Sequence, residues 1–548
     1  MAKDDKIFEN LPNSVVEYIN LVIKNMRYRK KARDEVREEL IDHFEQHLKD
    51  CATNEEKEQK VQQLISEFGD PKLLAILMRR AKKRCRPLWQ KILVRSFAAA
   101  LVIFAYLLIC ASWLRMGTPT IRINYAQWLT DQQRQGRDES LNAKPEIDKA
   151  IEAIHDVNEL VNVYDILRSW PTDLNDAQKN FVSNFLRDNN QAFENLKTAL
   201  QKPYFWTDYN SAGPIVIGSY TNIVENPQFW DNLMQSLASY RRITYALAAS
   251  VNWRAHTGDF EGAVDDLSTL IKFSSHYNGQ TLVEQLVSVA IKSLTNNRII
   301  QFLSHVDLSA AQLKKLQNEF SASFSNEFPF DLTGEKAFWY SHIEQGFTDN
   351  GRGNGRILKS GAFYFVRDWR DWIWSFLTFS FPDRKQAVAE VEKTFDEIQQ
   401  NLQITPWQKK DKLLLNPSGS SRKTFMLKVM TDLDSISIIG WRLKTHQEAT
   451  LTILAAMRYQ KDKAAFPDNL EQLVNTGYLA KLPQDPFGPS LLTYKKTDNA
   501  FLLYSWGENL KDDGGQVMPD KKGWRNPFSD NGDWVFWPMV DGRYDQKK

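Results

Sequence analysis

The sequence is poor in cysteine. Cys51, Cys85 and Cys110 are its only three cysteines, and none lies beyond residue 110. The long C-terminal part therefore cannot be held by disulfide bonds and must be stabilised by packing. Seventeen tryptophans supply large apolar side chains for that purpose.

Familiar enzyme signatures are also missing. The chain has no Gly-x-Ser-x-Gly elbow, no His-Glu-x-x-His and no paired-cysteine metal motif. The glycine-rich segment 350–356 lacks the Gly-Lys-Ser/Thr ending of a phosphate loop, so we expect no nucleotide binding. The 68 acidic residues leave carboxylate chemistry open, but the sequence defines no catalytic residue.

One long run without charge is present, from Ser96 to Leu114, between Arg95 and Arg115. At about 1.5 Å per residue these nineteen residues extend roughly 28 Å as a helix, close to the ~30 Å hydrocarbon core of a bilayer. The sequence therefore predicts a single transmembrane helix over residues 92–115. About ninety mostly polar residues precede it, so we expect an anchor and not a cleaved signal peptide.

Flanking charge predicts the orientation of this helix. Residues 1–95 hold 21 Lys and Arg against 16 Asp and Glu, a net charge of +5, which leaves −3 for the rest. A basic strip precedes the run: Arg79, Arg80, Lys82, Lys83, Arg84, Arg86, Lys91 and Arg95. The positive-inside rule places the N-terminus in the cytoplasm and the C-terminal part across the inner membrane, in the periplasm. We expect the strip to attract anionic lipid and expect no nucleic-acid partner.

The segment 1–90 reads as a compact helical unit. Apolar residues recur at helical spacing in three stretches, and Gly69 and Pro71 mark the end of one helix and the start of the next. The segments 38–44 (EELIDHF) and 68–75 (FGDPKLLA) resemble the HAAS-type domain, a small cytoplasmic helical module of bacterial membrane proteins associated with signalling. This resemblance covers about residues 12–84 and implies a protein-interaction or regulatory role. His43 and His47 share a helical face, but packing explains them better than a metal site, because no further ligand stands at a recognisable spacing.

Residues 117–430 read as an α-helical exported domain. Helical periodicity covers Ile147–Leu167, Asp176–Leu200 and Phe229–Ala255, with further helices expected at Thr281–Phe302 and Ala310–Phe324. The segment 245–273 predicts two helices joined by a tight turn at 258–260, with Ala263, Leu267 and Leu270 inward. It resembles a tetratricopeptide-type hairpin, which implies either a partner-binding groove or a plain helical pair.

An aromatic segment follows between residues 363 and 381. It carries nine aromatic side chains interrupted by Arg367, Asp368, Arg370 and Asp371. Three interpretations stay open: a helix buried between subdomains, an interfacial helix on the outer membrane face, and a sugar-binding surface. Burial is the commonest fate of such side chains.

The C-terminal segment 431–548 carries another resemblance. A long helix ending near Gln460 leads into 466–470 (FPDNL), 482–488 (LPQDPFG), 503–507 (LYSWG) and 512–515 (DDGG). The order resembles the C-terminal part of the major pseudopilin of type II secretion, as also found in membrane-anchored proteins of planctomycete-like bacteria. It implies a small α+β module ending in a calcium loop. A pseudopilin has its hydrophobic helix continuous with this spine, whereas here more than three hundred residues intervene, which argues against a filament.

Calcium is the one ligand with a physical argument. Asp512, Asp513, Glu508 and Asn509 offer hard oxygen ligands in a glycine-rich turn. The simpler alternative is a set of solvated turn residues. The sequence thus predicts a candidate calcium site and no other cofactor.

Together these features predict a mainly α protein: a cytoplasmic helical bundle, one transmembrane helix, a large helical exported domain and a small α+β module. The preferred hypothesis is a single-pass envelope protein that binds protein partners on one or both sides, as a signal relay or a scaffold. The alternatives are an envelope hydrolase acting on a polymer near Trp369–Trp374 and a component related to type II secretion.

Overall fold

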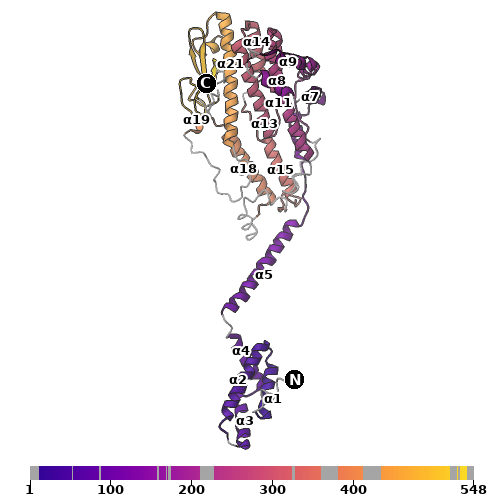
Figure 1. The fold of residues 1–548 in the computed structure, drawn as a ribbon, viewed down its shortest axis with the longest axis vertical. Coiled ribbons are helices and arrows are strands. Elements are labelled where there is room, and N and C mark those ends of the chain that lie inside the picture. The colour runs from indigo at the N-terminus through magenta and orange to yellow at the C-terminus, as the bar shows by residue number, and fades with distance from the viewer. Residues whose placement is uncertain are drawn as a thin grey trace. The chain divides into compact units, whose positions relative to one another are not determined.

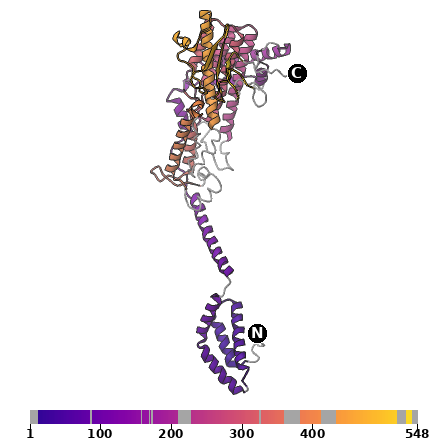
Figure 2. The same cartoon turned by 90° about the vertical axis from the view of Figure 1, so that its left-hand side faces the viewer.

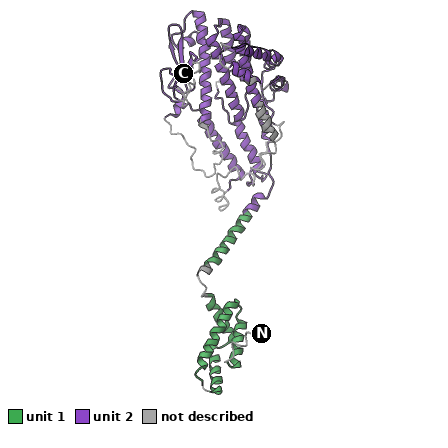
Figure 3. Cartoon of the chain, in the orientation of Figure 1, with its two compact units in different colours: residues 1–109 green, residues 110–548 purple. Residues whose placement is uncertain are grey.

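The computed structural model describes residues 11–51, 53–84, 88–156, 159–167, 170, 174–209, 227–323, 327–358, 381–410, 433–518, 528 and 531–539. It divides the chain into two compact units, residues 1–109 and 110–548, each described by itself below (Figure 3). The described part is mainly helical with one small sheet, which confirms the predicted fold class at that level.

The first four helices of unit 1 share a core of their own (Figure 1). They are α1 (Asn13–Asn25), α2 (Lys30–Leu48), α3 (Asn54–Phe68) and α4 (Pro71–Arg84). Thr53 and Glu56 form a capping box at the start of α3. Gly69 at φ 75° ends this helix, and this end is the one that the sequence predicts. The buried core residues all lie between Leu11 and Ala75. This unit therefore closes its core without any residue beyond α4.

The helix α5 (Leu88–Arg115) contains the predicted transmembrane run. Within the described residues, Ile92–Arg115 is the one helical stretch long and apolar enough to cross a membrane. Large apolar side chains are exposed along it from Ile92 to Ile109. At about 1.5 Å per residue this open apolar stretch is about 27 Å long, which matches a bilayer core.

Unit 2 is a stack of helices with a small sheet along α21 (Figures 1 and 2). Its helices are α6 (Tyr125–Arg134), a 3-10 turn (Glu139–Leu141), α7 (Lys144–Glu152), α8 (Glu159–Leu167), α9 (Asp176–Asp188), α10 (Asn190–Ala199), α11 (Pro227–His256), α12 (Phe260–His276), α13 (Leu282–His305), α14 (Ala310–Ser323), α15 (Thr333–Gly346), α18 (Arg384–Leu402), α19 (Pro406–Lys409), α21 (Leu433–Lys463) and α22 (Leu470–Asn475). The helix α13 packs against α11, α12 and α21.

Two of the predicted helical stretches are each interrupted. The stretch 147–167 contains α7 and α8, because the chain turns between them and Asp156 adopts φ 58°. The stretch 176–200 contains α9 and α10, separated at Asn189, whose side chain bonds to the Phe185 carbonyl and ends α9. Both stretches are helical, as their periodicity predicts, but each is divided between two helices. The expected helices near 281–302 and 310–324 are confirmed as α13 and α14.

The sheet has three antiparallel strands in the order β1-β2-β3. They are β1 (Thr493–Lys496), β2 (Phe501–Ser505) and β3 (Trp534–Trp537). Thr493 pairs with Tyr504, and the β2–β3 register shifts between Leu503 and Tyr504. The main core of unit 2 runs from Ala126 to Phe536, so the helical part and the C-terminal module share one core.

Candidate functional site

The C-terminal end of α5 is built into the core of unit 2. Ile109 is 67% exposed, whereas Cys110 and Leu114 are only 1% and 3% exposed. Leu114 packs in a small core with buried residues of α15 and α18: Trp339, Ile343, Ala387, Val391 and Phe395. The open apolar surface of α5 therefore ends where unit 2 begins.

Arg356 closes the end of this helix. Its guanidinium donates hydrogen bonds to the carbonyl oxygens of Trp113 and Met116 and lies 4.5 Å from the centroid of the Trp113 ring. Carbonyls in the last turn of a helix have no partner within the helix, so an arginine there is favourable. Gly117 follows at φ 101°, and a Cβ there would lie 3.0 Å from the Thr348 methyl. The chain thus leaves α5 tightly against the loop after α15.

Four charged residues tie the next segment to α15 and α18. We call Arg122, Glu344, Asp349 and Arg384 the junction network. Arg384 pairs with Glu344 and, at 3.4 Å, with Asp349, and all three side chains are at most 7% exposed. Arg122 donates its backbone N–H to Glu344 at 2.6 Å and its Nε to Asp349 at 2.5 Å. The segment after the apolar helix is therefore fixed and not a free linker.

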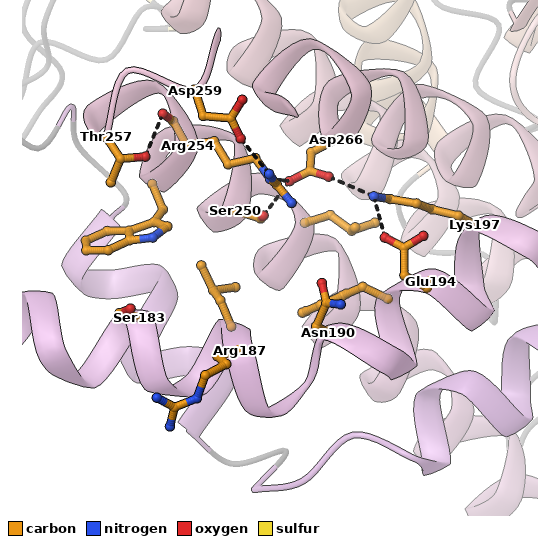
Figure 4. A pocket seen from close by; sticks show the side chains of 14 residues that line it. Ser183, Arg187, Asn190, Glu194, Lys197, Ser250, Arg254, Thr257, Asp259 and Asp266 are labelled. Atoms are coloured by element: carbon orange, nitrogen blue, oxygen red, sulfur yellow. Dashed lines mark hydrogen bonds and ion pairs between the residues drawn. The ribbon is translucent and has the colours of Figure 1, made fainter. Parts of the chain in front are cut away.

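A second feature of unit 2 is a pocket of about 400 Å³ between α9–α10 and the α11–α12 hairpin (Figure 4). The hairpin is the one that the sequence predicts, with Gly258 at φ 82° in its turn and Asp259 capping α12 through the Gly262 N–H. Ala263, Leu267 and Leu270 are fully buried, as predicted. The pocket is lined on the hairpin side by Leu247, Ser250, Trp253, Arg254, Thr257, Asp259 and Asp266, and on the other side by Ser183, Leu186, Arg187, Asn190, Phe193, Glu194 and Lys197.

Asp266 is the centre of the charge network in this pocket. Its carboxylate accepts hydrogen bonds from the Ser250 hydroxyl at 2.5 Å and from Arg254 Nε at 2.7 Å, and it lies 3.3 Å from Lys197 Nζ. Figure 4 shows it between the two cations. Arg254 also pairs with Asp259 at 2.6 Å. Both oxygens of the buried carboxylate are thus used inside the protein.

Neighbouring groups favour the charged forms of Lys197, Arg254 and Asp259 by shifting their pKa values. Burial alone would lower the pKa of Lys197, but its hydrogen bond to Glu194 and the charge of Asp266 outweigh burial and raise it. The pKa of Arg254 is raised in the same way by Asp266 and Asp259, against burial. The Gly262 N–H and Arg254 lower the pKa of Asp259. These five side chains pair with one another and form one wall of the pocket.

The groups left for a ligand are polar and aromatic. Arg187 and Asn190 are exposed at the rim, and Trp253 and Phe193 offer apolar surface in the pocket. Such a mixture offers hydrogen-bonding groups beside apolar and aromatic surface. Asp266 is recognisable only after folding: in the sequence it is one acid beside Leu267 on a helix expected to be buried.

The predicted calcium residues lie on one turn but have protein partners. Glu508 pairs with Arg442, Asp512 accepts from the Tyr504 hydroxyl at 2.9 Å, and Asp513 accepts from Asn509 at 2.7 Å. The described residues contain no group of three or more His, Cys, Asp or Glu arranged to hold a metal. Calcium binding here stays a prediction.

Asp533, which the sequence does not single out, joins this turn from the start of β3. It accepts the backbone N–H groups of Asp513 and Gly515. Burial raises its pKa to about 6, against those two hydrogen bonds and with help from Asp513 and Asp512. It lies twenty residues along the chain from Asp513, too far for a local motif.

Two further sequence features have simple outcomes. His43 and His47 stack at 4.3 Å between ring centroids, and His43 contacts the Phe68 ring edge to face at 5.1 Å, which fits the packing interpretation. The aromatic segment 363–381 falls almost wholly outside the described residues, so its three interpretations stay open.

Comparison with known proteins gives no family for this chain. No family model, no curated protein and no solved structure matches it.

Proposed function

We propose that the protein is a single-pass membrane protein that relays or scaffolds protein interactions between the cytoplasm and an exported compartment. The observation that carries this proposal is the junction at the end of α5. A mere anchor needs only an apolar helix and a flexible linker. Here Cys110 is buried, Leu114 belongs to a small core of unit 2, and Arg356 caps the helix.

The junction supports coupling because it fixes the helix in rotation. The stretch Ser96–Ile109 carries no charge, and its exposed apolar side chains give lipid no single face by which to orient it. Cys110 and Leu114 are buried and lie four residues apart, so the last turns of α5 have one buried face. A turn or tilt of unit 2 is then passed to the continuous helix.

The partner-binding surface on the exported side is, in this proposal, the pocket on the tetratricopeptide-like hairpin. The HAAS-type unit supplies the cytoplasmic surface. The ion pairs of Asp266 hold the pocket wall rigid. Arg187 and Asn190 at the rim contact the partner.

Crosslinking in living cells tests this proposal. Partners are recovered by pull-down and assigned by mass spectrometry to residues 1–90 or 117–548. Arg187→Ala with Asn190→Ala should remove the exported-side partner. The control is Lys179→Ala with Gln191→Ala, which also takes one cation from α9 and one amide from α10 but lies outside the pocket lining. No recovered partner, or equal loss in both pairs, contradicts the proposal.

A second variant separates a relay from a scaffold. Several Gly and Ser residues inserted between Met116 and Gly117, combined with Leu114→Ser and Arg356→Ala, interrupt the fixed junction, because the two substitutions remove the contacts that hold the end of α5 against unit 2. In a relay, losing the exported-side partner changes the cytoplasmic crosslinks in the native chain but not in the insertion variant. In a scaffold, the insertion leaves crosslinks on both sides unchanged.

A further inference from the structure

Helix α4 of unit 1 has two apolar faces, and only one of them is covered. Leu74 and Ala75 are buried in the core of unit 1. Leu73, Ile76 and Leu77 are 58%, 47% and 52% exposed. Their spacing of three and four residues puts them on one side of the helix, facing away from the core. The sequence shows one apolar stretch here and does not reveal that half of it is open.

The open face is bordered by cations without partners. Arg80 continues the apolar row one turn beyond Ile76 and Leu77, and Lys72, Arg79 and Lys83 flank it. All four are exposed, and the structure gives none of them an acidic partner among the described residues. Lys82, on the core side, is different, because it pairs with Glu35 at 3.2 Å and with Glu39 at 2.5 Å. The face is thus apolar in the middle and positively charged at its edge.

The chain holds this face near the start of the apolar helix. Only residues 85–87 stand between α4 and α5, so the Cα atoms of Arg84 and Leu88 are at most about 15 Å apart. Leu77 lies seven residues before Arg84, about 10 Å along the helix. The face can therefore reach the membrane surface that α5 enters, whatever the orientation of helices α1–α4.

We propose that the Leu73, Ile76, Leu77 and Arg80 face of α4 docks unit 1 onto the anionic inner leaflet of the membrane. An amphipathic helix with apolar side chains and a cationic border inserts shallowly among headgroups of this charge. A second copy of the face is a poorer occupant, because two rows of unpaired cations would meet. The docking rests on the proposed membrane anchoring but is tested without α5.

The test uses residues 11–84, which have a core of their own. This fragment contains no tryptophan, so Leu77→Trp gives a single reporter, and Gln62→Trp on the exposed side of α3 gives its control. The probes are vesicles of phosphatidylcholine alone or with one third phosphatidylglycerol. With the anionic vesicles, we expect a blue shift of Leu77→Trp emission but not of Gln62→Trp emission.

Charge removal tests the lipid specificity. Arg79→Gln, Arg80→Gln and Lys83→Gln together should weaken partitioning onto anionic vesicles by more than tenfold, because each surface cation strengthens such binding severalfold. The control, Lys30→Gln, Lys31→Gln and Lys49→Gln, removes three exposed cations elsewhere. Circular dichroism checks that every variant is folded.

Two results would overturn the inference. One is a folded Leu77→Trp fragment whose emission does not respond to anionic vesicles. The other is a blue shift that grows with protein concentration in the absence of vesicles, which assigns the face to a second copy. Neither result bears on the proposed relay, because the crosslinking experiment detects protein partners and not lipid binding.

Discussion

Replacing Arg384 by methionine tests the junction network most directly. The side chain of Arg384 is 6% exposed and meets Glu344 and Asp349, themselves 7% and 3% exposed. It also donates to the Thr120 carbonyl at 3.3 Å. The substitution keeps much of the apolar stem but removes the charge, and so leaves Glu344 without its cation.

The expected cost follows from this burial. Removing one partner of a buried ion pair typically destabilises by 3–5 kcal/mol, because the other charge stays desolvated and unpaired. Asp349 keeps Arg122 at 2.5 Å, so we expect the lower part of that range, about 3 kcal/mol. Arg384→Met with Glu344→Gln removes the stranded charge and should recover at least about 1 kcal/mol.

Guanidinium unfolding of the full chain in detergent micelles, followed by circular dichroism, measures these differences. Lys393→Met is the matched control on the same helix, because the Lys393–Glu397 pair is 3.9 Å apart and mostly exposed. It should change the free energy of unfolding by less than about 0.5 kcal/mol. A cost of Arg384→Met equal to that of the control, or a double variant no more stable than the single one, refutes the reasoning.

The remaining predictions concern three other places. His446 lies between the rings of Phe528 and Phe536, and burial lowers its pKa to about 3. Because the unfolded chain takes up the proton at higher pH than the folded chain, the free energy of unfolding should fall as pH drops from about 6 to 4, by up to about 1.4 kcal/mol per pH unit. This pH dependence should weaken in His446→Leu but not in a variant of the exposed His155. Leu267→Ala should cost about 2–5 kcal/mol in urea unfolding, whereas Phe260→Ala on the same helix, 44% exposed, should cost less than about 1 kcal/mol. If the predicted calcium loop binds, Ca²⁺ raises the Tm and Asp512→Asn with Asp513→Asn abolishes the rise; equal Tm values in Ca²⁺ and chelator contradict that prediction.

The features predictable from the sequence are those fixed by nearby residues. Thr281 and Glu284 form the capping box that starts α13, and the predicted turn at Gly258 needs only its own neighbours. The break at Asp156 does not follow from the sequence, because the residues around it keep helical spacing. Only the pairing of α7 with α10 and of α8 with α11 shows that the chain turns there. Periodicity shows which residues are apolar, but it does not show which of them are buried against another helix.

The candidate sites needed the fold because their residues come from distant segments. Arg356 reaches Trp113 across 243 positions, and Arg122 reaches Glu344 across 222. No local pattern encodes such a contact. The pocket is partly predictable from the sequence. The sequence predicts the α11–α12 hairpin that forms one wall, but it does not predict that α9 and α10 form the other.

The two ends of α5 give different constraints, and their combination is what a relay needs. At the C-terminal end, buried Leu114, the Arg356 cap and the junction network leave no free linker. At the N-terminal end only residues 85–87 separate α5 from α4. If α4 docks on lipid, its contact with the leaflet lies only a few residues along the chain from the start of α5, so a movement of α5 acts on a helix that is held at the membrane. Release of the α4 face is then the natural cytoplasmic readout of an exported-side event, and weakening that face by charge removal should mimic the signal in the absence of a partner.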